Sequence, residues 1–366
     1  MVAMDNNHHQ KVKVSRDDGA DSYDNEFYRR DKFILRVMSV YGILTDRFLW
    51  SFPRVTVSLS LLIYILSVGG FCVTAYASFP LKFEFDSLLV EYLNQVILTS
   101  NCCICSAIFL YLWLKKGRFQ KYYIKLLEAV EACRAIGIDI DSKHTRLEKF
   151  AITFVMINVI AMTLILICGA FSDFQFMTLY QEGGPIMTKF RNEVALQVIK
   201  VIGAFTFCLI QASTLLVPAY FIFTARLLSY SFQQFNKSLT RKLQADELNS
   251  VKIAIEHRPA HLSLREAGKI SNDCWNQMIG FYMLSIICVE LLGLYYLVIN
   301  IYNGLAEQAL IVNGSLVQLA VIQALMIWAC HYLAGDSMAA GDALMNIRAS
   351  NSRGRDVAQV SYRTIA

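Results

Sequence analysis

The sequence predicts an all-α, polytopic membrane helix bundle with six transmembrane helices and with both chain ends in the cytoplasm. Three observations point to this fold class: the composition, six long apolar stretches, and the distribution of Lys and Arg between those stretches. Of the 366 residues, 55% are hydrophobic and 17% are charged, and the mean hydropathy is +0.42. Because a soluble chain of this size carries about 25% charged residues, the composition argues against a soluble enzyme.

Lys and Arg fall into alternate gaps between the apolar stretches. Counted from the N-terminus, the seven gaps hold nine, one, nine, two, eight, no and four basic residues. Cytoplasmic loops collect Lys and Arg, so the crowded gaps are expected inside the cell. The same bias explains the net charge of +5, and we therefore expect no nucleic-acid partner.

Each apolar stretch is long enough for the approximately 20 residues that a helix needs to cross the hydrocarbon core. Trp50, Trp113 and Trp275 fall at the expected inner boundaries, where indole rings favour the headgroup layer. Pro218 lies inside the fourth span, which a membrane helix tolerates when neighbours satisfy the freed carbonyl. In order, the expected spans are Val55–Ala77, Leu88–Leu114, Phe150–Phe171, Val194–Ala225, Met278–Ile301 and Ile311–Ala334.

The expected inner connections, Lys115–Lys149 and Arg226–Ser271, are longer than the outer ones. Both carry helical spacing, so we expect the second and fourth helices to continue into the cytoplasm as amphipathic extensions. The extensions are interpreted either as surface helices at the membrane or as a packing domain between subunits. In the first connection, the apolar residues at helical spacing are Tyr122, Leu126, Val130 and Cys133.

The expected organisation has three parts. Residues 1–50 form a cytoplasmic N-terminal tail that ends in an amphipathic segment, residues 51–335 form the six-helix bundle, and residues 336–366 form a cytoplasmic C-terminal tail. Such a chain is a multi-pass protein whose first partner is the lipid bilayer.

Two ionisable residues lie inside the expected spans, where charge is costly and often functional. Glu290 lies in the outer half of the fifth span, and Lys200 lies one to two turns inside the outer end of the fourth. The two side chains are expected at similar depth, where they either pair with each other or act separately. Lys200 also has a simpler interpretation, because a lysine stem can carry its ammonium to the outer interface.

Polar amides and aromatic residues in the same spans add to this set. Gln197 and Gln318 lie in the outer half, and Tyr295 follows Glu290 by five positions. Amides in membrane helices often only join helices, through hydrogen bonds worth about 1 kcal/mol or less. The predicted lining of a small-molecule pocket is nevertheless Glu290, Gln197, Gln318 and Tyr295.

Signatures of catalysis are missing from the sequence. It contains no nucleophile elbow, no Gly-rich phosphate loop and no paired-histidine zinc motif. We therefore expect no catalytic residues, no metal site and no cofactor.

Four segments together resemble the insect-type gustatory receptor family. They are KFILRVMSVYGILTDR at Lys32–Arg47, SLREAGKISNDCWN at Ser263–Asn276, the aromatic pair Tyr295-Tyr296, and the stretch Cys330–Arg348 after the sixth span. The first resembles the amphipathic stretch before that family's first span, and the second resembles its entry into the fifth. The last resembles the linker to the family's final helix, and invertebrate gustatory-receptor-like proteins fit as well as insect ones.

The resemblance implies a chemosensory receptor of the plasma membrane that is itself a ligand-gated cation channel. In this family, as in the similar odorant receptors, four subunits surround a central pore and each binds a small molecule within its own helices. The resemblance therefore implies a homo- or hetero-tetramer. The cytoplasmic N-terminus derived from the charge distribution agrees with it.

The sequence departs from the family pattern at its C-terminal end. The family carries a seventh, pore-lining helix with a Thr-Tyr…Gln-Phe signature, whereas the tail after Ala334 is hydrophilic and lacks it. A truncated isoform without the pore helix is the expectation that follows. Three alternatives stay open: a light- or peroxide-sensing relative of the same family, a secondary transporter that uses Glu290 and Lys200, and a non-conducting scaffold.

Overall fold

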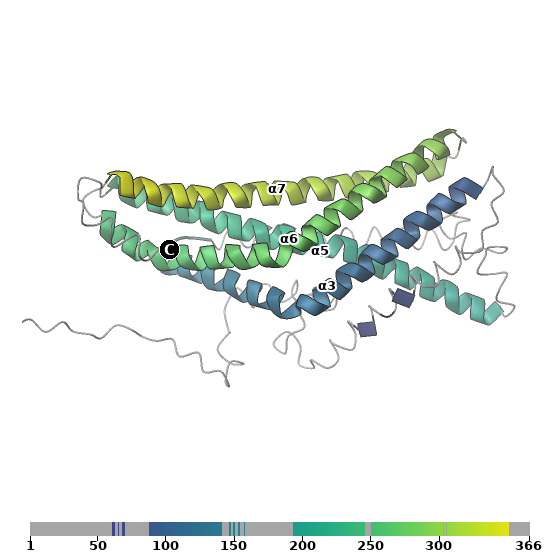
Figure 1. The fold of residues 1–366 in the computed structure, drawn as a ribbon, viewed down its shortest axis with the longest axis horizontal. Helices are drawn as coiled ribbons and strands as arrows, with labels where there is room; N and C mark the ends of the chain where they lie inside the picture. Colours follow the sequence, from purple (N-terminus) through teal and green to yellow (C-terminus); the bar gives the residue numbers. More distant parts are fainter. Residues whose placement is uncertain are drawn as a thin grey trace, which may run out of the picture.

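The computed structural model describes residues 88–140, 193–245, 250–302 and 306–350, together with Gly304 and single positions between 61 and 69 and between 146 and 157. The described part is built almost entirely from four long helices (Figure 1). They are α3 (Leu88–Ala135), α5 (Glu193–Ala245), α6 (Ser250–Tyr302) and α7 (Ala306–Ser350).

All four helices are far longer than a membrane is thick. They contain 48, 53, 53 and 45 residues. At 1.5 Å per residue such helices run about 70–80 Å, whereas the hydrocarbon core is about 30 Å thick. Each helix that crosses a bilayer therefore continues well beyond it.

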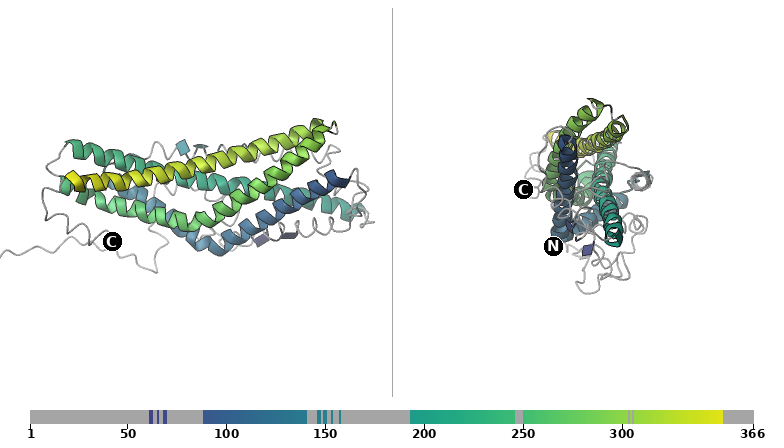
Figure 2. Two further views of the ribbon diagram at one scale, coloured as in Figure 1. Left: turned by 45° about the horizontal axis from the view of Figure 1, so that its top comes forward. Right: turned by 90° about the vertical axis from the view of Figure 1, so that its right-hand side faces the viewer.

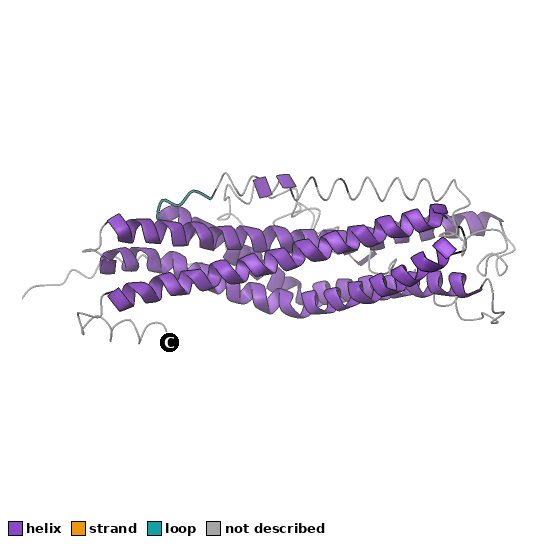
Figure 3. Cartoon of the chain, turned by 90° about the horizontal axis from the view of Figure 1, so that it is seen from above, coloured by secondary structure: helices purple, strands orange, loops and turns teal. Residues whose placement is uncertain are grey.

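The four helices lie side by side along one axis (Figures 1 and 3). Contacts join α3 to α6, α6 to α7, α7 to α5 and α5 to α3, and α5 also touches α6. Seen from the end, the helices form a narrow bundle (Figure 2, right). The richest contacts are those between α3 and α6 and between α5 and α7.

The contact between α3 and α6 follows a heptad-like spacing on both helices. A helix whose apolar residues recur every three and four positions presents one continuous seam to its neighbour. The buried residues of this kind on α6 are Ile253, His257, Ala260, Leu264, Ala267, Ser271, Cys274, Met278 and Tyr282, and those on α3 are Ile108, Leu112, Phe119, Tyr122, Leu126, Val130 and Cys133.

The helix α5 is the central element of the described bundle. Three stretches are long and apolar enough to cross a membrane by length and composition, and they lie within Leu215–Ala245, Lys252–Ile299 and Leu316–Ala339. In α5, 89% of the apolar window is buried by the protein, against 28% in α6 and 17% in α7. Side chains surround α5 between Leu215 and Ala245, while the apolar windows of α6 and α7 turn apolar faces outward.

Two helix ends are fixed by glycines in the left-handed conformation. At the end of α3, Gly137 has φ +81°, and Ile138 N donates to Cys133 O at 3.1 Å. This is the Schellman arrangement, which satisfies carbonyls left open at a helix terminus. Between α6 and α7, Gly304 has φ +72° and its N donates to Ile301 O at 3.1 Å, forming a tight hairpin.

Four of the six predicted spans correspond to these helices: the second to α3, the fourth to α5, the fifth to α6 and the sixth to α7. The first and third, Val55–Ala77 and Phe150–Phe171, lie largely outside the described residues, as does Trp50. The expected continuation of the second and fourth helices is confirmed. The helices α6 and α7 are continuous too, and α7 passes without a break through residues 335 and 336.

Two predictions need correction. The segment before Met278 was expected as part of a connection, yet α6 begins at Ser250, because its charged residues face outward while the seam residues face α3. Trp275 was expected in the headgroup layer, yet only 2% of it is exposed. Since α6 continues past this position, the indole packs between helices; Trp113, at 45% exposure, does lie on the surface.

Candidate ligand site within the helix bundle

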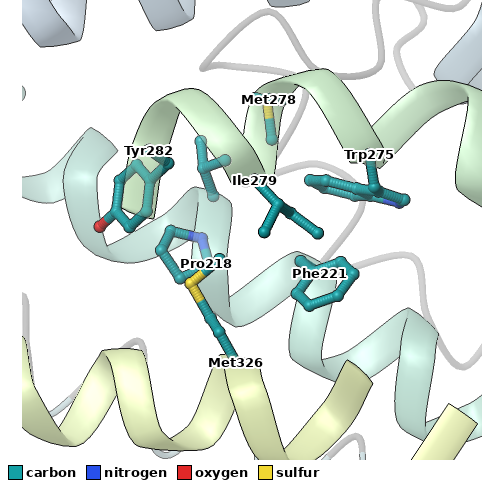
Figure 4. Close-up of a pocket in the computed structure, with 8 residues that line it drawn as sticks. Pro218, Phe221, Trp275, Met278, Ile279, Tyr282 and Met326 are labelled. Atoms are coloured by element: carbon teal, nitrogen blue, oxygen red, sulfur yellow. The ribbon is translucent and has the colours of Figure 1, made fainter. Parts of the chain in front are cut away.

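A small apolar pocket lies where α5, α6 and α7 meet, beside Pro218 (Figure 4). Met326 reaches from α7 toward Pro218, and Trp275 and Tyr282 mark its two ends on α6. The empty space is about 170 Å³ in total but nowhere wide enough for a water molecule. Its lining is Val217, Pro218, Phe221, Trp275, Met278, Ile279, Tyr282 and Met326.

An aromatic cluster forms the inner wall of this pocket around Trp275. The Trp275 ring centroid lies 5.0 Å from that of Phe119, 5.1 Å from Phe221 and 5.7 Å from Tyr220. Edge-on and tilted aromatic pairs at these distances add about 0.5–1.5 kcal/mol each to their burial. One indole therefore joins α3, α5 and α6 at a single level.

Beside this cluster, α3 and α6 are also joined by a polar contact. The Tyr111 hydroxyl donates to the carbonyl of Cys274 at 3.1 Å. Farther along α3, burial raises the pKa of Tyr122 to about 12, with its hydroxyl turned toward Ser271 and Thr224. The phenol is therefore neutral at any physiological pH and acts as a packing group.

Of the four predicted lining residues, Glu290 and Gln318 lie at one level. Tyr282 and Met326 line the same pocket, and a Cβ added to Gly293 would lie 2.7 Å from Leu316 Cδ2. This antiparallel register of α6 and α7 places Glu290 and Gln318 at the same level, with Gln318 on a different face of α7 from Leu316. Both side chains are partly buried, and Glu290 Oε1 is buried without a hydrogen-bond partner.

The structure does not bring Tyr295 and Gln197 to that level of the bundle. Tyr295 is 51% exposed, whereas its neighbour Tyr296, at 6%, holds the buried position. Gln197 lies near the start of α5, and its side chain is outside the described residues. From the register of α5 with α7, its backbone lies about 20 Å farther along the axis than Gln318.

A polar joint between α5 and α7 was missed by the sequence reasoning. The Arg226 guanidinium lies 4.0 Å from the ring centroid of Trp328 and 4.7 Å from that of Tyr332. The Ser229 hydroxyl donates to the Asp336 carboxylate, and Asn236 Nδ2 donates to the Asp336 carbonyl at 3.0 Å. The available signal was the Trp328–Tyr332 spacing of four, which puts both rings on one helix face.

A second buried polar group lies farther along the bundle, between α5 and α6. His257 is fully buried, and its Nδ1 lies 2.9 Å from the carbonyl of Ile253, so Nδ1 carries the proton. Its Nε2 is buried without a hydrogen-bond partner. Phe235 lies against both His257 and His261, with ring centroids 5.9 and 5.8 Å away.

Burial lowers the pKa of His257 and of His261 from the usual histidine value. The neutral imidazole is therefore the form that fits this part of the core. The nearest charges, Lys242 and Glu256, pair with each other across α5 and α6 at 3.5 Å.

No known protein family profile and no curated protein matches the sequence. Among solved structures, the chain is similar to the insect olfactory receptor OR5 from Machilis hrabei, with a TM-score of 0.52, 10% identity, and coverage of 88% of this chain and 81% of that one. The same receptor in complex with eugenol gives a TM-score of 0.47 at 10% identity, over 89% of this chain and 100% of that one. At such low identity the similarity concerns the fold alone: this chain has the helical membrane-receptor fold of an insect olfactory receptor.

Proposed function

We propose that this protein is a chemosensory receptor of the gustatory type, a subunit of a ligand-gated cation channel in the plasma membrane. A small molecule binds within its transmembrane helices, and four subunits, identical or mixed, form the channel. The proposal rests mainly on the similarity of fold to an insect olfactory receptor, which extends over 88% of the chain.

Two further features support this proposal. The distribution of Lys and Arg predicts a cytoplasmic N-terminus, as in the family that the sequence segments resemble. The bundle also holds a small apolar pocket at a three-helix junction, a usual place for small-molecule sites in helical proteins.

Within this proposal, the ligand enters between the outer halves of the helices. Glu290 and Gln318, which lie at one level of the bundle, are the proposed polar contacts on α6 and α7. Gln197 and Tyr295 remain proposed contacts, on α5 and on the exposed side of α6. The apolar pocket beside Pro218 and Trp275 is nowhere wide enough for a water molecule without a ligand, so the helices have to part for it to take the apolar part of one.

The test is functional expression of the full chain in oocytes, alone and together with candidate partner subunits. Whole-cell current is recorded during application of sugars, phenols, amines and aliphatic alcohols at millimolar concentration. We expect an inward cation current with at least one class. Currents absent under every condition, with the protein demonstrably at the surface, would count against the channel.

The same expression system tests two of the alternatives, the light- or peroxide-sensing relative and the transporter. A current evoked by illumination or by hydrogen peroxide, without any organic ligand, identifies a light- or peroxide-sensing relative. Accumulation of a labelled solute driven by an ion gradient identifies a transporter, and this activity would be lost in both Glu290→Gln and Lys200→Met.

The proposal of a truncated isoform has its own test. Sequencing full-length transcripts from the codon of Ala349 onward reveals whether a further span with a Tyr…Gln-Phe ending follows in any of them. Native gel electrophoresis and cross-linking of the purified product then give the number of subunits.

A further inference from the structure

The outer halves of α6 and α7 face each other along a defined seam. Gly293 lies against Leu316, and the same register sets residue 286 opposite Gln323. On a helix, positions separated by three, four and seven lie on one face. Glu290 lies between positions 286 and 293, so it shares the face of α6 that meets Gln323 and Leu316.

This seam holds two buried polar atoms without a hydrogen-bond partner in the part of the chain that the structure describes. Glu290 Oε1, an acceptor, and Gln323 Nε2, a donor, are both buried without a hydrogen-bond partner. The hydroxyl of Ser285 is committed elsewhere, because it donates to the carbonyl of Phe281 at 2.8 Å. A buried polar atom without a partner costs about 1–3 kcal/mol, so two of them one turn apart indicate a missing molecule.

The seam also lacks a cation. Residues 274–302 and 306–330, which form its two walls, contain no Lys, Arg or His, and neither does the apolar part of α3, residues 88–114. In the apolar part of α5, the basic residue is Lys200, whose backbone lies level with Tyr296. Glu290 is therefore the charge in this seam, and a carboxylate away from water requires a positive partner.

We infer that the seam between α6 and α7 binds a small protonated amine, with its ammonium on Glu290 and an oxygen acceptor of the ligand on Gln323. This inference rests on the proposed function and names the ligand class of that site. A ligand of this class would provide hydrogen-bond partners for both Glu290 Oε1 and Gln323 Nε2. A neutral ligand satisfies the Gln323 donor and leaves the carboxylate without its cation.

The apolar pocket is the place for the rest of such a molecule once the helices part, because without a ligand it is too narrow for a water molecule. Tyr282 and Met326 belong to its lining, and Gln323 lies one turn outward from Met326. An aromatic ring among Met278, Tyr282 and Met326 would be continuous with an amine that extends along the seam. Since Gly293 and Leu316 are in close contact, binding separates α6 from α7 at this level.

The test uses matched probes on the purified full chain in detergent. Phenethylamine and 2-phenylethanol share a ring and a chain and differ in the ammonium group; 2-amino-1-phenylethanol adds to the amine an oxygen acceptor that lies between the ring and the ammonium, at the level of Gln323. Ligand binding to the folded state raises the melting temperature in proportion to the logarithm of concentration over Kd. We expect both amines at millimolar concentration to stabilise the protein, and 2-phenylethanol to leave it unchanged.

Three variants assign the contacts. Glu290→Gln should weaken amine binding at least tenfold, whereas Glu256→Gln, a matched change elsewhere on α6, should not. Gln323→Leu should reduce the affinity for 2-amino-1-phenylethanol to that for phenethylamine. If Glu290→Gln fails to fold, Gln323→Leu and the comparison of probes on the native chain carry the test.

Several outcomes would overturn the inference. Equal stabilisation by phenethylamine and 2-phenylethanol would make the site neutral, and stabilisation by NaCl relative to choline chloride, without an amine effect, would assign it to an inorganic cation. Amine binding that emerges only in Lys200→Met would show an internal ion pair instead. Ligand-evoked current without amine binding refutes this inference alone, while amine binding without current refutes the channel alone.

Discussion

The two halves of the bundle are held together in different ways. In the half expected on the cytoplasmic side, α3 and α6 bury continuous seams against each other, and side chains such as Tyr122 and Leu126 are 0% exposed. In the outer half, α6 exposes large apolar side chains, with Leu291 63% and Val298 62% exposed. The first half resembles a soluble helical domain, and the second presents the surface that lipid or further helices cover.

Charge follows the same division. Lys125 contacts Glu128 at 2.7 Å and Glu266 at 3.5 Å, linking α3 to α6 on the surface of the inner half. Beyond Cys274, α6 carries a single charge, Glu290. Water stabilises the exposed charges of the inner half, whereas charge in the outer half is costly and is therefore rare. The comparison teaches that contacts between helices are densest in the inner half, while the outer half is where we propose that recognition takes place.

Removing the indole of Trp275 should lower the free energy of unfolding more than any other change proposed here. Trp275→Ala empties the contact of three helices, and a buried Trp→Ala change costs about 3–5 kcal/mol. We expect this loss in the free energy of unfolding measured by SDS titration in mixed micelles. Trp113→Ala, at an exposed tryptophan of α3, should cost less than about 1 kcal/mol. Equal losses in both variants would remove the contrast between packed and exposed positions.

Removing the cation–π contact between α5 and α7 should give the next largest loss in the free energy of unfolding. Arg226→Met and Trp328→Leu remove the two partners of a cation–π contact, and their double-mutant cycle should give a coupling of about 1–2 kcal/mol. The unfolding free energies of the two single variants and the double variant provide the measurement. Arg241→Met, an exposed arginine on the same helix, should show no coupling to Trp328→Leu.

Two glycines of α6 allow a sharper comparison. Gly280→Ala meets nothing within 4 Å and should stabilise the helix by up to about 1 kcal/mol. Gly293→Ala places a Cβ against Leu316, so the gain in helix stability should be offset by the displacement of the Leu316 side chain. We expect unfolding free energies that differ by about 1 kcal/mol between the two variants. If both substitutions stabilise equally, α6 and α7 are not in close contact in the outer half.

The smallest expected effect is a dependence of the stability of the inner half on pH. The pKa values of buried His257 and His261 are lowered in the folded chain, so the unfolded chain takes up protons first as the pH falls. Stability is therefore complete above about pH 6.5, the ordinary histidine value, and decreases below it. Melting temperatures between pH 7.5 and 5.5 should show this decrease.

The control variants for this dependence are histidines of different burial. The double variant His257→Leu/His261→Leu should flatten the profile, and His331→Leu, at an exposed histidine, should leave it unchanged. A steep profile that persists in the double variant would place the pH-sensitive group elsewhere.

Much of the fold is readable in the sequence. The spacing of Tyr122, Leu126, Val130 and Cys133 predicted a helix with one buried face, and all four side chains are fully buried. Hydropathy placed the second, fourth, fifth and sixth spans on real helices. Both signals work because periodicity and apolar length are local properties of the chain.

The inner half of α6 was not recognised, although its seam is equally regular. Charges at Arg265, Glu266 and Lys269 favoured a connection, yet Leu264 and Ala267 next to them are fully buried. The charge content of the segment hid the regular spacing of its buried residues. Trp275 was misplaced for a related reason, because a helix end was expected where none exists.

The site was predicted only in part because it depends on the register between helices. Glu290 stood out as a lone charge in an apolar span, and Gln318 lies at the same level on α7. No sequence pattern distinguishes Tyr295 from Tyr296, which are adjacent and lie on different faces. Arg226 and Asp336 belong to helices distant in sequence, and their joint depends on the packing of α5 against α7.

The unbroken length of α3 and α6 has a mechanical consequence. Trp275 joins them at a contact from which α6 extends about 40 Å to either side. A tilt of α6 by about 5° about this contact displaces its tip by roughly 3.5 Å, enough to shift a side chain past its neighbour. A movement that parts α6 from α7 at Gly293 would therefore reach the Ser250 end of α6 with about 1.4 times its amplitude.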